Sequence, residues 1–394
     1  MRSDASESSR VGDVAQESIY ASLGIRTWIN ADTTISRLGG SLMPDVVLRA
    51  MIDASRHFVD MMQLEEAVGR EIARMTHNDA ALVCSGAAAG LYLATLACIT
   101  GADERRVSSF RAGRLNPSER REIVLQSAHR SPYGTQMRTA GAVIVEVGGA
   151  LDTEEIDLVS AISDRTAAVA FMAGDHFARG SLPLETVIEV AHAAGVPVIV
   201  DAAAQLPPRA NLWRFTQLGA DLVIFSGGKQ LRGPQCTGLI VGREDLVRAC
   251  SLHAAPRHGL GRAMKVGKEE VVGLLAAVRW YLAEDEAAEL DRCERVVERW
   301  RTTLSGAPGV VAERSYPGEA GRHLPRLHVR TQHPCPLSTA EAVALLRDSD
   351  PPIALGSASD GGFFVSPELL DDIEVALVDQ ALKRILLNNL VAGR

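Results

Sequence analysis

Short apolar runs alternate with amphipathic segments over the first 240 residues of the chain. Ala80–Cys84, Thr166–Met172 and Val196–Val200 are almost continuously apolar and end at polar or glycine-rich residues. Runs of this length, bounded by turn residues, predict buried strands. The segments between them repeat apolar residues at helical spacing, as in Val46–Ile52. This alternation of strands and helices predicts an α/β fold with a mostly parallel sheet.

The pattern changes after residue 240. Glu269–Ser305 is a long amphipathic stretch, which predicts one helix that connects two domains. The later residues mix short predicted strands (326–330 and 362–365) with predicted helices (339–347 and 373–389). We therefore expect a disordered tail at 1–16, a large domain at 17–285 and a small α+β C-terminal domain at 286–394.

The most informative stretch joins two apolar runs, Asp221–Ser226 and Thr237–Gly242. Two glycines and Lys229 follow the first run, so the lysine is expected at the tip of a strand pair. A surface lysine in a turn is the simplest interpretation. A nucleotide phosphate loop is excluded, because Val223 and Gln230 occupy the positions where it needs glycine and serine or threonine.

A third interpretation makes Lys229 a Schiff-base lysine that holds pyridoxal 5′-phosphate (PLP). That chemistry needs an acid at a nearby strand end, to pair with the pyridine nitrogen, and Asp201 follows the apolar run Val196–Val200. It also needs an anchor for the phosphate. Ser85 and Gly86 lie between a strand and a helix of small residues, where free backbone N–H groups bind anions. Tight packing of that helix on the sheet is the alternative explanation for the small residues.

Other polar side chains near predicted strand ends are candidates for the site. His129 follows the run Glu122–Gln126 and could stack on a flat ring or move protons, although a single loop histidine is as often a surface residue. We predict a substrate-binding role for side chains that are suited to a carboxylate or lie close to these ends, namely Asn30, Thr34, Arg37, Arg130, Tyr133, Arg262 and Lys265.

Composition narrows the class of protein. The formal net charge of −8 disfavours a nucleic-acid partner, which needs a basic surface. The six cysteines lie far apart, without the spacing of a zinc site, a redox motif or a disulfide framework, which predicts a reducing, cytoplasmic location. The N-terminus has no apolar core of a signal peptide, and no run approaches membrane length.

Together these motifs resemble PLP-dependent enzymes of the aspartate-aminotransferase fold (fold type I). Within that fold the chain is most similar to the selenocysteine-synthase-like group, which includes D-glucosaminate-6-phosphate ammonia-lyase. The resemblance covers about residues 20–290 and rests on five stretches: Ile29–Ala31 with Leu38–Ser41, Val83–Gly90, Ile199–Pro208, Ser226–Lys229 and Gly261–Glu269.

The resemblance implies roles for particular residues. Lys229 matches the Schiff-base lysine, and Asp201 matches the acid that pairs with the pyridine nitrogen. Ser85, Gly86 and Ala87 match the phosphate-binding turn, and His129 falls where such enzymes place a ring-stacking residue. Ala203 and Ser226, within the same motifs, complete the expected cofactor-binding set.

The resemblance also implies partners. Sites of this fold usually lie at a dimer interface, so a homodimer or higher homo-oligomer is expected. Selenocysteine synthases carry an extra N-terminal segment for tRNA. This chain begins its core almost at once and is acidic, so we expect a small-molecule substrate and neither tRNA nor a membrane partner.

The leading hypothesis for function is α,β-elimination from a hydroxy amino acid or an amino-sugar acid, giving a 2-oxo acid and ammonia. Lys229 would remove the α-proton, for which burial must lower its pKa. Racemisation or epimerisation is the alternative and needs a second acid, for which His129 and Tyr133 are candidates. A β-replacement transferase or aldolase comes next. A non-catalytic protein of this fold is least favoured, since it would not need both Lys229 and Asp201.

Overall fold

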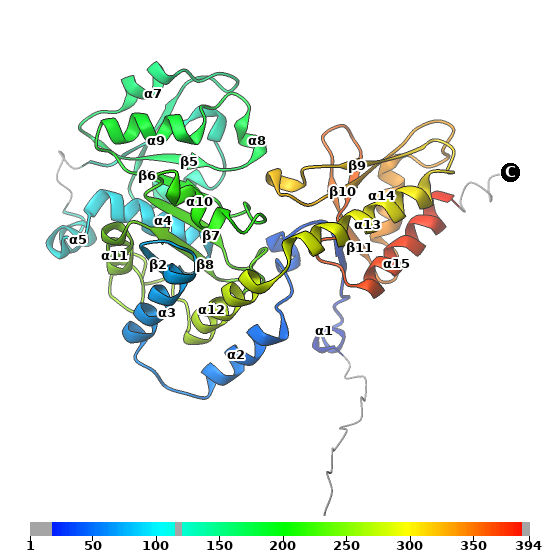
Figure 1. The fold of residues 1–394 in the computed structure, drawn as a ribbon, viewed down its shortest axis with the longest axis horizontal. Coiled ribbons are helices and arrows are strands. Elements are labelled where there is room, and N and C mark those ends of the chain that lie inside the picture. Colours follow the sequence, from blue (N-terminus) through cyan, green and yellow to red (C-terminus); the bar gives the residue numbers. More distant parts are fainter. Residues whose placement is uncertain (1–17, 115–119, 388–394) are drawn as a thin grey trace, which may run out of the picture.

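The structure is a computed structural model that describes residues 18–114 and 120–387. The tail predicted at 1–16 lies outside these residues. Two sheets organise the described chain, one in the larger body on the left of Figure 1 and one in the smaller body on the right. The α/β fold that the alternating pattern predicts is therefore present.

The larger sheet has seven strands in the order β2-β8-β7-β6-β5-β3-β4. Their bounds are β2 Ala80–Cys84, β3 Glu122–Gln126, β4 Val143–Val147, β5 Thr166–Met172, β6 Val198–Asp201, β7 Leu222–Ser226 and β8 Gly238–Gly242. Only β8 runs antiparallel to its neighbours, β2 and β7. Since β3, β5, β6 and β7 are parallel, their carboxyl ends meet at one edge, where sheets of this kind place ligands.

Alternate residues of these strands enter two different cores. Val124, Val169 and Val223 belong to one buried cluster, whereas Ile199 and Ile224 belong to the other. This division follows from the two-residue period of a strand. A sheet covered on both faces needs near-continuous apolar strands, which is the pattern seen in the sequence.

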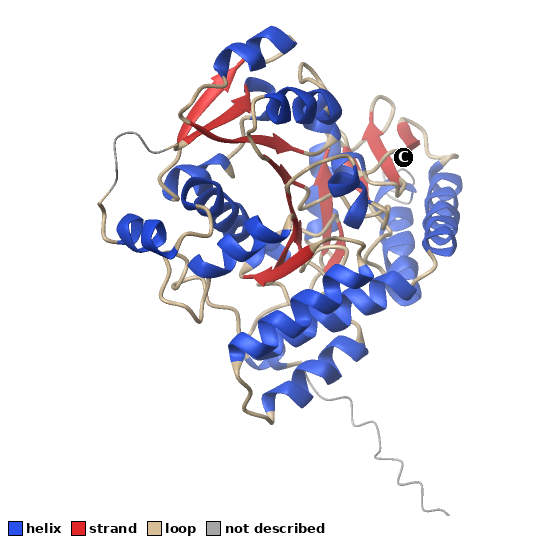
Figure 2. Ribbon diagram, turned by 60° about the vertical axis from the view of Figure 1, so that its left-hand side comes forward, coloured by secondary structure: helices blue, strands red, loops and turns tan. Residues whose placement is uncertain are grey.

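Helices cover both faces of the larger sheet (Figure 2). Those of this body are α2 Asp45–Ser55, α3 Met61–Met75, α4 Gly86–Thr100, α5 Glu104–Arg111, α6 Gly134–Thr139, α7 Glu155–Ala161, α8 Asp175–Ala178, α9 Leu184–Ala193, α10 Asn211–Gln217, α11 Glu244–His253 and α12 Lys268–Ala283. The central one, α4, is buried on nearly all sides and contacts β7 and β8. Its small residues allow this, because Gly90 lies against the Ile224 side chain.

The smaller sheet has five strands in the order β1-β11-β12-β10-β9. Their bounds are β1 Ile29–Ala31, β9 Val310–Ser315, β10 Arg326–Thr331, β11 Ile353–Ser357 and β12 Phe363–Val365. The helices α13 Glu286–Leu304, α14 Thr339–Arg347 and α15 Asp372–Leu382 pack on it around Trp300 and Phe363. The N-terminal helix is the short α1 Ile19–Ser22.

The structure corrects the expected domain boundaries in one respect. The N-terminal segment was assigned to the large domain at 17–285, but β1 pairs in parallel with β11 of the smaller sheet. Ile29 and Ala31 are buried in the smaller core, so the apolar character of this strand is satisfied there.

A second correction concerns the helix expected over Glu269–Ser305. The chain forms two helices, α12 and α13, which are separated at Glu284 and Asp285. The Asp285 side chain accepts hydrogen bonds from the N–H groups of Ala287 and Ala288, so it caps the start of α13. Only two residues separate the helices, which is why the sequence pattern resembles one helix.

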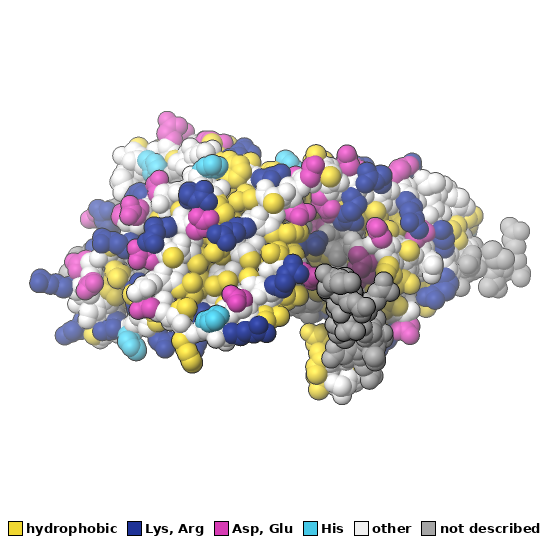
Figure 3. All heavy atoms as spheres, turned by 60° about the horizontal axis from the view of Figure 1, so that its bottom comes forward, with side chains coloured by type: hydrophobic (Ala, Val, Ile, Leu, Met, Phe, Trp, Pro, Cys, Tyr) yellow, Lys and Arg dark blue, Asp and Glu magenta, His cyan; other side chains and the backbone are white. Residues whose placement is uncertain are grey.

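Among the described residues, no single helix is long and apolar enough to cross a membrane; α4 and α5 meet the length and composition test only as a pair bent by 114°. Exposed apolar side chains cluster in sequence on α2, on α3 and between them: Val46, Leu48, Ile52, Phe58, Val59 and Met62. Figure 3 shows apolar side chains gathered on the side of the molecule where α2 and α12 lie. A face of this kind commonly binds another protein surface.

Candidate functional site

A cavity of about 300 Å³ lies at the carboxyl ends of the parallel strands. Its walls come from the loops after β2, β3, β5, β6 and β7, from residues after β1 and from the segment before β10. The lining residues are Thr34, Ser36, Gly86, Ala87, Ala88, Tyr133, Met172, Ala173, His176, Phe177, Asp201, Ala203, Ala204, Ser226, Lys229, Gln235 and Glu319. A cavity of about 340 Å³ beside the α12–α13 junction contains neither Lys229 nor Asp201.

Lys229 lies in the connection between the antiparallel strands β7 and β8, as the two apolar runs predict. The preceding glycines have little room. A Cβ at Gly227 would lie 2.0 Å from Thr237 Oγ1, and one at Gly228 would lie 2.6 Å from Gln235 Cα. The glycines therefore let the two sides of the connection pack together, and this directs the lysine into the cavity.

The charge of Lys229 is set by opposing effects. Burial lowers the pKa of the amine, while the carboxylates of Glu319 and Asp201 raise it and the Arg322 guanidinium lowers it. The net direction is downward, so a larger share of the amine is unprotonated near neutral pH than in a solvent-exposed lysine. A buried, partly neutral amine is suited both to covalent bonding with a carbonyl and to proton abstraction.

Asp201 ends β6 and is buried, with 8% of its surface exposed. One carboxylate oxygen accepts a hydrogen bond of 3.0 Å from the N–H of Ala203. Burial raises the pKa of Asp201, whereas the Ala203 N–H and Lys229 lower it. A buried carboxyl group with one oxygen left over is a strong acceptor for a cationic N–H group placed in the cavity.

The start of α4 forms another wall. Gly86 has φ +84°, a value that glycine adopts without strain, and it turns the chain from β2 into the helix. On its other side β8 passes very close, because a Cβ at Gly238 would lie 2.5 Å from the Gly86 carbonyl carbon. Gly86, Ala87 and Ala88 line the cavity, and backbone N–H groups at a helix start bind anions. Ser85 occupies the capping position without a side-chain cap bond.

His129 lies behind the wall of the cavity and is not among its lining residues. It is 1% exposed and meets the rings of Phe171 and Phe177 edge-on, at 4.6 and 5.8 Å. Its Nδ1 accepts a hydrogen bond from the Met172 N–H, and burial lowers its pKa to about 4. The imidazole is therefore neutral at physiological pH, with the proton on Nε2, which has no partner in the described chain.

The structure separates the candidate substrate residues into two groups. Thr34 and Tyr133 line the cavity. The other candidates are not among its lining residues. Asn30 closes a turn through Thr33 O and the Asp32 N–H, and Arg130 pairs with Glu146. Arg37, Arg262 and Lys265 are exposed.

Sequence reasoning missed several residues of the cavity. His176 and Phe177, on α8, follow the carboxyl end of β5, so the rule applied to His129 could have found them. Glu319 comes from the other body of the molecule, in the 3₁₀ turn η3 (Glu319–Gly321). No motif near Lys229 indicates it, because 90 residues separate the two positions (319 − 229 = 90).

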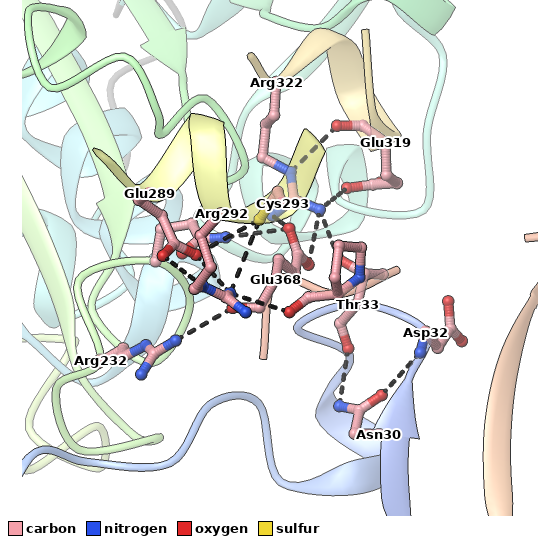
Figure 4. A network of polar contacts seen from close by, with 12 residues as sticks. Asn30, Asp32, Thr33, Arg232, Glu289, Arg292, Cys293, Glu319, Arg322 and Glu368 are labelled. Carbon is pink, nitrogen blue, oxygen red and sulfur yellow. Dashed lines mark hydrogen bonds and ion pairs between the residues drawn. The ribbon is translucent and has the colours of Figure 1, made fainter. Parts of the chain in front are cut away.

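A buried polar network supports this smaller-body wall (Figure 4). Arg322 and Glu368, each with a 3% exposed side chain, form an ion pair of 2.8 Å. Arg322 also pairs with Glu319 at 3.3 Å and donates to the Thr33 hydroxyl. Glu368 accepts a hydrogen bond of 3.1 Å from Gln230, the residue after Lys229. The network therefore connects the lysine loop to the smaller body.

Comparisons with known proteins agree with the fold. A family model described as "SelA: L-seryl-tRNA selenium transferase" matches residues 30–301. A "5'-C-glycyluridine monooxygenase-decarboxylase" from Streptomyces sp is 39% identical over 319 residues, which cover 78% of this chain and 76% of the relative.

D-glucosaminate-6-phosphate ammonia lyase from Salmonella typhimurium is 32% identical over 379 residues, which cover 93% of this chain and 97% of the relative. A solved structure of D-glucosaminate-6-phosphate ammonia-lyase superimposes with a TM-score of 0.81 at 31% identity and covers 95% of this chain and 99% of that one. The similarity extends over both bodies of the molecule.

Proposed function

Because this chain belongs to the SelA family, whose members use PLP, we propose that it is a PLP-dependent lyase. The reaction is α,β-elimination from a hydroxy amino acid or an amino-sugar acid. The β-hydroxyl group leaves as water, and hydrolysis of the resulting enamine takes up one water again, so the net products are a 2-oxo acid and ammonia. The observation that carries the proposal is the meeting of Lys229, Asp201 and the start of α4 in one cavity.

The residues of the cavity fit PLP. Lys229 supplies a buried amine for the carbonyl group, and the free oxygen of Asp201 supplies an acceptor for the pyridine nitrogen. Gly86 leaves open space beside its Cα, with no atom within 4 Å of a Cβ built there, and the α4 N–H groups point to the same region. Ser85, Gly86 and Ala87 would hold the phosphate, with Ala203 and Ser226 beside the ring.

The chain's own residues contribute base, orientation and exclusion of water. Bound PLP supplies an electron sink that stabilises negative charge at the α-carbon of an amino acid. When freed by a substrate amine, Lys229 would serve as the base for the α-proton and would carry the proton to the departing hydroxyl group. Thr34 and Tyr133 line the cavity with hydroxyl groups, which would donate hydrogen bonds to the substrate, and Met172 and Phe177 line it with apolar side chains.

A second reaction is favoured by the relative with 39% identity, which is named a monooxygenase-decarboxylase. Oxidative decarboxylation of an amino acid would use the same Lys229 and Asp201, with molecular oxygen as co-substrate. It would release carbon dioxide where elimination releases a 2-oxo acid with all of its carbon atoms. Racemisation loses one of its candidate acids, since His129 does not line the cavity.

A substrate screen separates these reactions. The PLP-loaded protein should convert D-glucosaminate or a related 2-amino-3-hydroxy acid to a 2-oxo acid with one equivalent of ammonia. Carbon dioxide release that requires oxygen would favour the second reaction, and deuterium uptake into unchanged amino acid would favour racemisation. In Asp201→Asn, turnover should fall by about 10²-fold while the fold persists, because the charge that polarises the ring is lost.

We also propose that the protein acts in the cytoplasm as a homo-oligomer. The exposed apolar side chains of α2, of α3 and of the segment between them support a protein partner, and a second copy is the simplest one. Light scattering of the purified protein tests this, with a mass that is a multiple of 42.1 kDa as the expected result.

A further inference from the structure

Glu319 has an unusual position for a carboxylate. Its side chain enters from the smaller body and lines the cavity that contains Lys229. Among the charged groups near Lys229, Glu319 has the largest influence on the amine. The side chain is nevertheless 42% exposed, so it is accessible to a molecule bound in the cavity that it lines.

The chain fixes this carboxylate from both sides. Arg322 pairs with it at 3.3 Å and is itself bound by Glu368. The next residue, Ala320, has φ +57°, a conformation that costs a non-glycine residue free energy. Its carbonyl accepts a hydrogen bond of 3.0 Å from Gln205 of the larger body. The position of Glu319 relative to Lys229 is therefore held through both bodies of the molecule.

The charges around the cavity indicate what this carboxylate faces. Lys229 is the only lysine or arginine among the described residues that line the cavity, whereas Asp201 and Glu319 are both acidic. Arg322 lies behind Glu319 with a side chain that is 3% exposed, and its charge is compensated by carboxylates. A substrate tail that carries a phosphate would meet negative charge here, whereas hydroxyl groups would find an acceptor.

We propose that Glu319 selects substrates by accepting hydrogen bonds from hydroxyl groups beyond the α-carbon, and that it disfavours a phosphorylated tail. The substrate class is thus an amino acid with an uncharged, hydroxylated tail, such as an unphosphorylated amino-sugar acid or a nucleoside-linked amino acid. This inference rests on the proposed function for the identity of the site. It adds a residue that determines specificity.

Binding measurements on the PLP-loaded protein test it. Calorimetry compares three probes of the same carbon chain length: D-glucosaminate, its 6-phosphate and D-norleucine, which has no hydroxyl group. The wild type should bind D-glucosaminate about tenfold more tightly than either of the others. In Glu319→Gln, which keeps the size of the side chain, both differences should fall to about twofold. Glu313→Gln, on the exposed face of β9, is the matched control and should keep the wild-type order.

The outcomes are distinct. Three results would overturn the role of Glu319. The affinity ratios could be equal in wild type and Glu319→Gln, the wild type could bind the 6-phosphate more tightly than D-glucosaminate, or no probe could bind. If the binding order follows the expectation but no 2-oxo acid forms, the proposed reaction fails and the selectivity stands. If ammonia and 2-oxo acid form but the affinity ratios between the probes are the same in wild type and Glu319→Gln, the reaction stands and the selectivity fails.

Discussion

The two walls of the cavity differ in how far their charged side chains are paired. On the larger body, the Lys229 amine has no hydrogen-bond partner among the described residues, and the Asp201 carboxylate has a single one. On the smaller body, Arg322 and Glu368 are paired with each other and bonded to further groups. Unpaired buried groups are costly, so their persistence indicates sites where a ligand completes them. Paired groups satisfy one another and hold a shape.

The difference suggests a division of labour. The larger-body wall supplies chemistry, and the smaller-body wall supplies position and selectivity. Glu319 is the point at which the two meet, because it belongs to the paired network yet acts on the amine of Lys229. Substitutions can alter each wall separately. Changes in the larger-body wall should reduce catalysis, and changes in the smaller-body wall should reduce stability or selectivity.

Removing the Lys229 amine from the larger-body wall, called the chemical wall below, has the largest expected effect. Lys229→Ala should abolish covalent attachment of PLP and lower turnover by about 10³-fold or more, because both the anchor and the base are lost. The visible absorbance of the purified protein and a substrate assay measure this. Lys383→Ala, at a lysine of the smaller body that pairs with Asp379, is the control and should keep colour and turnover. A coloured, active Lys229→Ala protein would refute the assignment.

Breaking the ion pair of the other wall should affect stability first. Glu368→Leu leaves the Arg322 guanidinium buried without its main partner, which costs about 3–5 kcal/mol in free energy of unfolding. The double variant Glu368→Leu with Arg322→Met removes both charges and should recover most of that loss. Urea denaturation of both variants measures the coupling. Additive losses would mean that the two residues do not act as a pair.

Acid should lower the free energy of unfolding through His129, which lies behind the chemical wall. The pKa of His129 is lowered by burial to about 4, so the unfolded chain takes up a proton near pH 6.5 that the folded chain resists. Stability is thus complete above about pH 6.5 and falls by at most about 3 kcal/mol as the pH drops towards 4. Unfolding of wild type and His129→Gln at pH 7.5 and 5 should show a smaller acid loss in the variant. His176→Gln, at an exposed histidine, should retain the wild-type loss.

The smallest expected effect tests the contact between the walls. Glu319 raises the pKa of Lys229, so Glu319→Gln should lower that pKa further. Attachment of PLP requires the unprotonated amine, so the pH midpoint of the attachment rate should move to lower pH. Stopped-flow absorbance measures the midpoint, with Glu313→Gln as the reference. A midpoint that stays constant or rises would show that Glu319 does not reach the amine.

Much of the chemical wall was predictable from the sequence because its residues follow strand ends. The strands β2, β3 and β5 have the predicted bounds, and Lys229, Asp201 and Gly86 come directly after or near such strands. The apolar period specifies strands that are buried on both faces, and parallel topology brings their ends together.

The smaller-body wall was not predictable in the same way. Arg322, Glu368 and Thr33 lie far apart in the chain, and only tertiary pairing makes them neighbours. The strands β9 and β11 and the helix α10 were also missed. β9, for example, carries charged residues and is half exposed, so its apolar signal is weak. His129 was predicted to act in the cavity, but the Phe171 and Phe177 rings pack against it and keep it behind the wall.

The pairing of β1 with β11 has a consequence for biosynthesis. Ile29 lies opposite Ile353 of β11, the strand with which β1 pairs in the described chain, so this partner is synthesised long after β1. The larger sheet, β2 to β8, is complete in sequence by residue 242 and can fold while the ribosome still adds the rest. The loop that carries Thr33 and Thr34, next to β1, cannot take its place until the C-terminal part emerges. A nascent chain therefore completes the cavity only after β11 has been synthesised, and C-terminal truncation should impair the site as surely as a change at its centre.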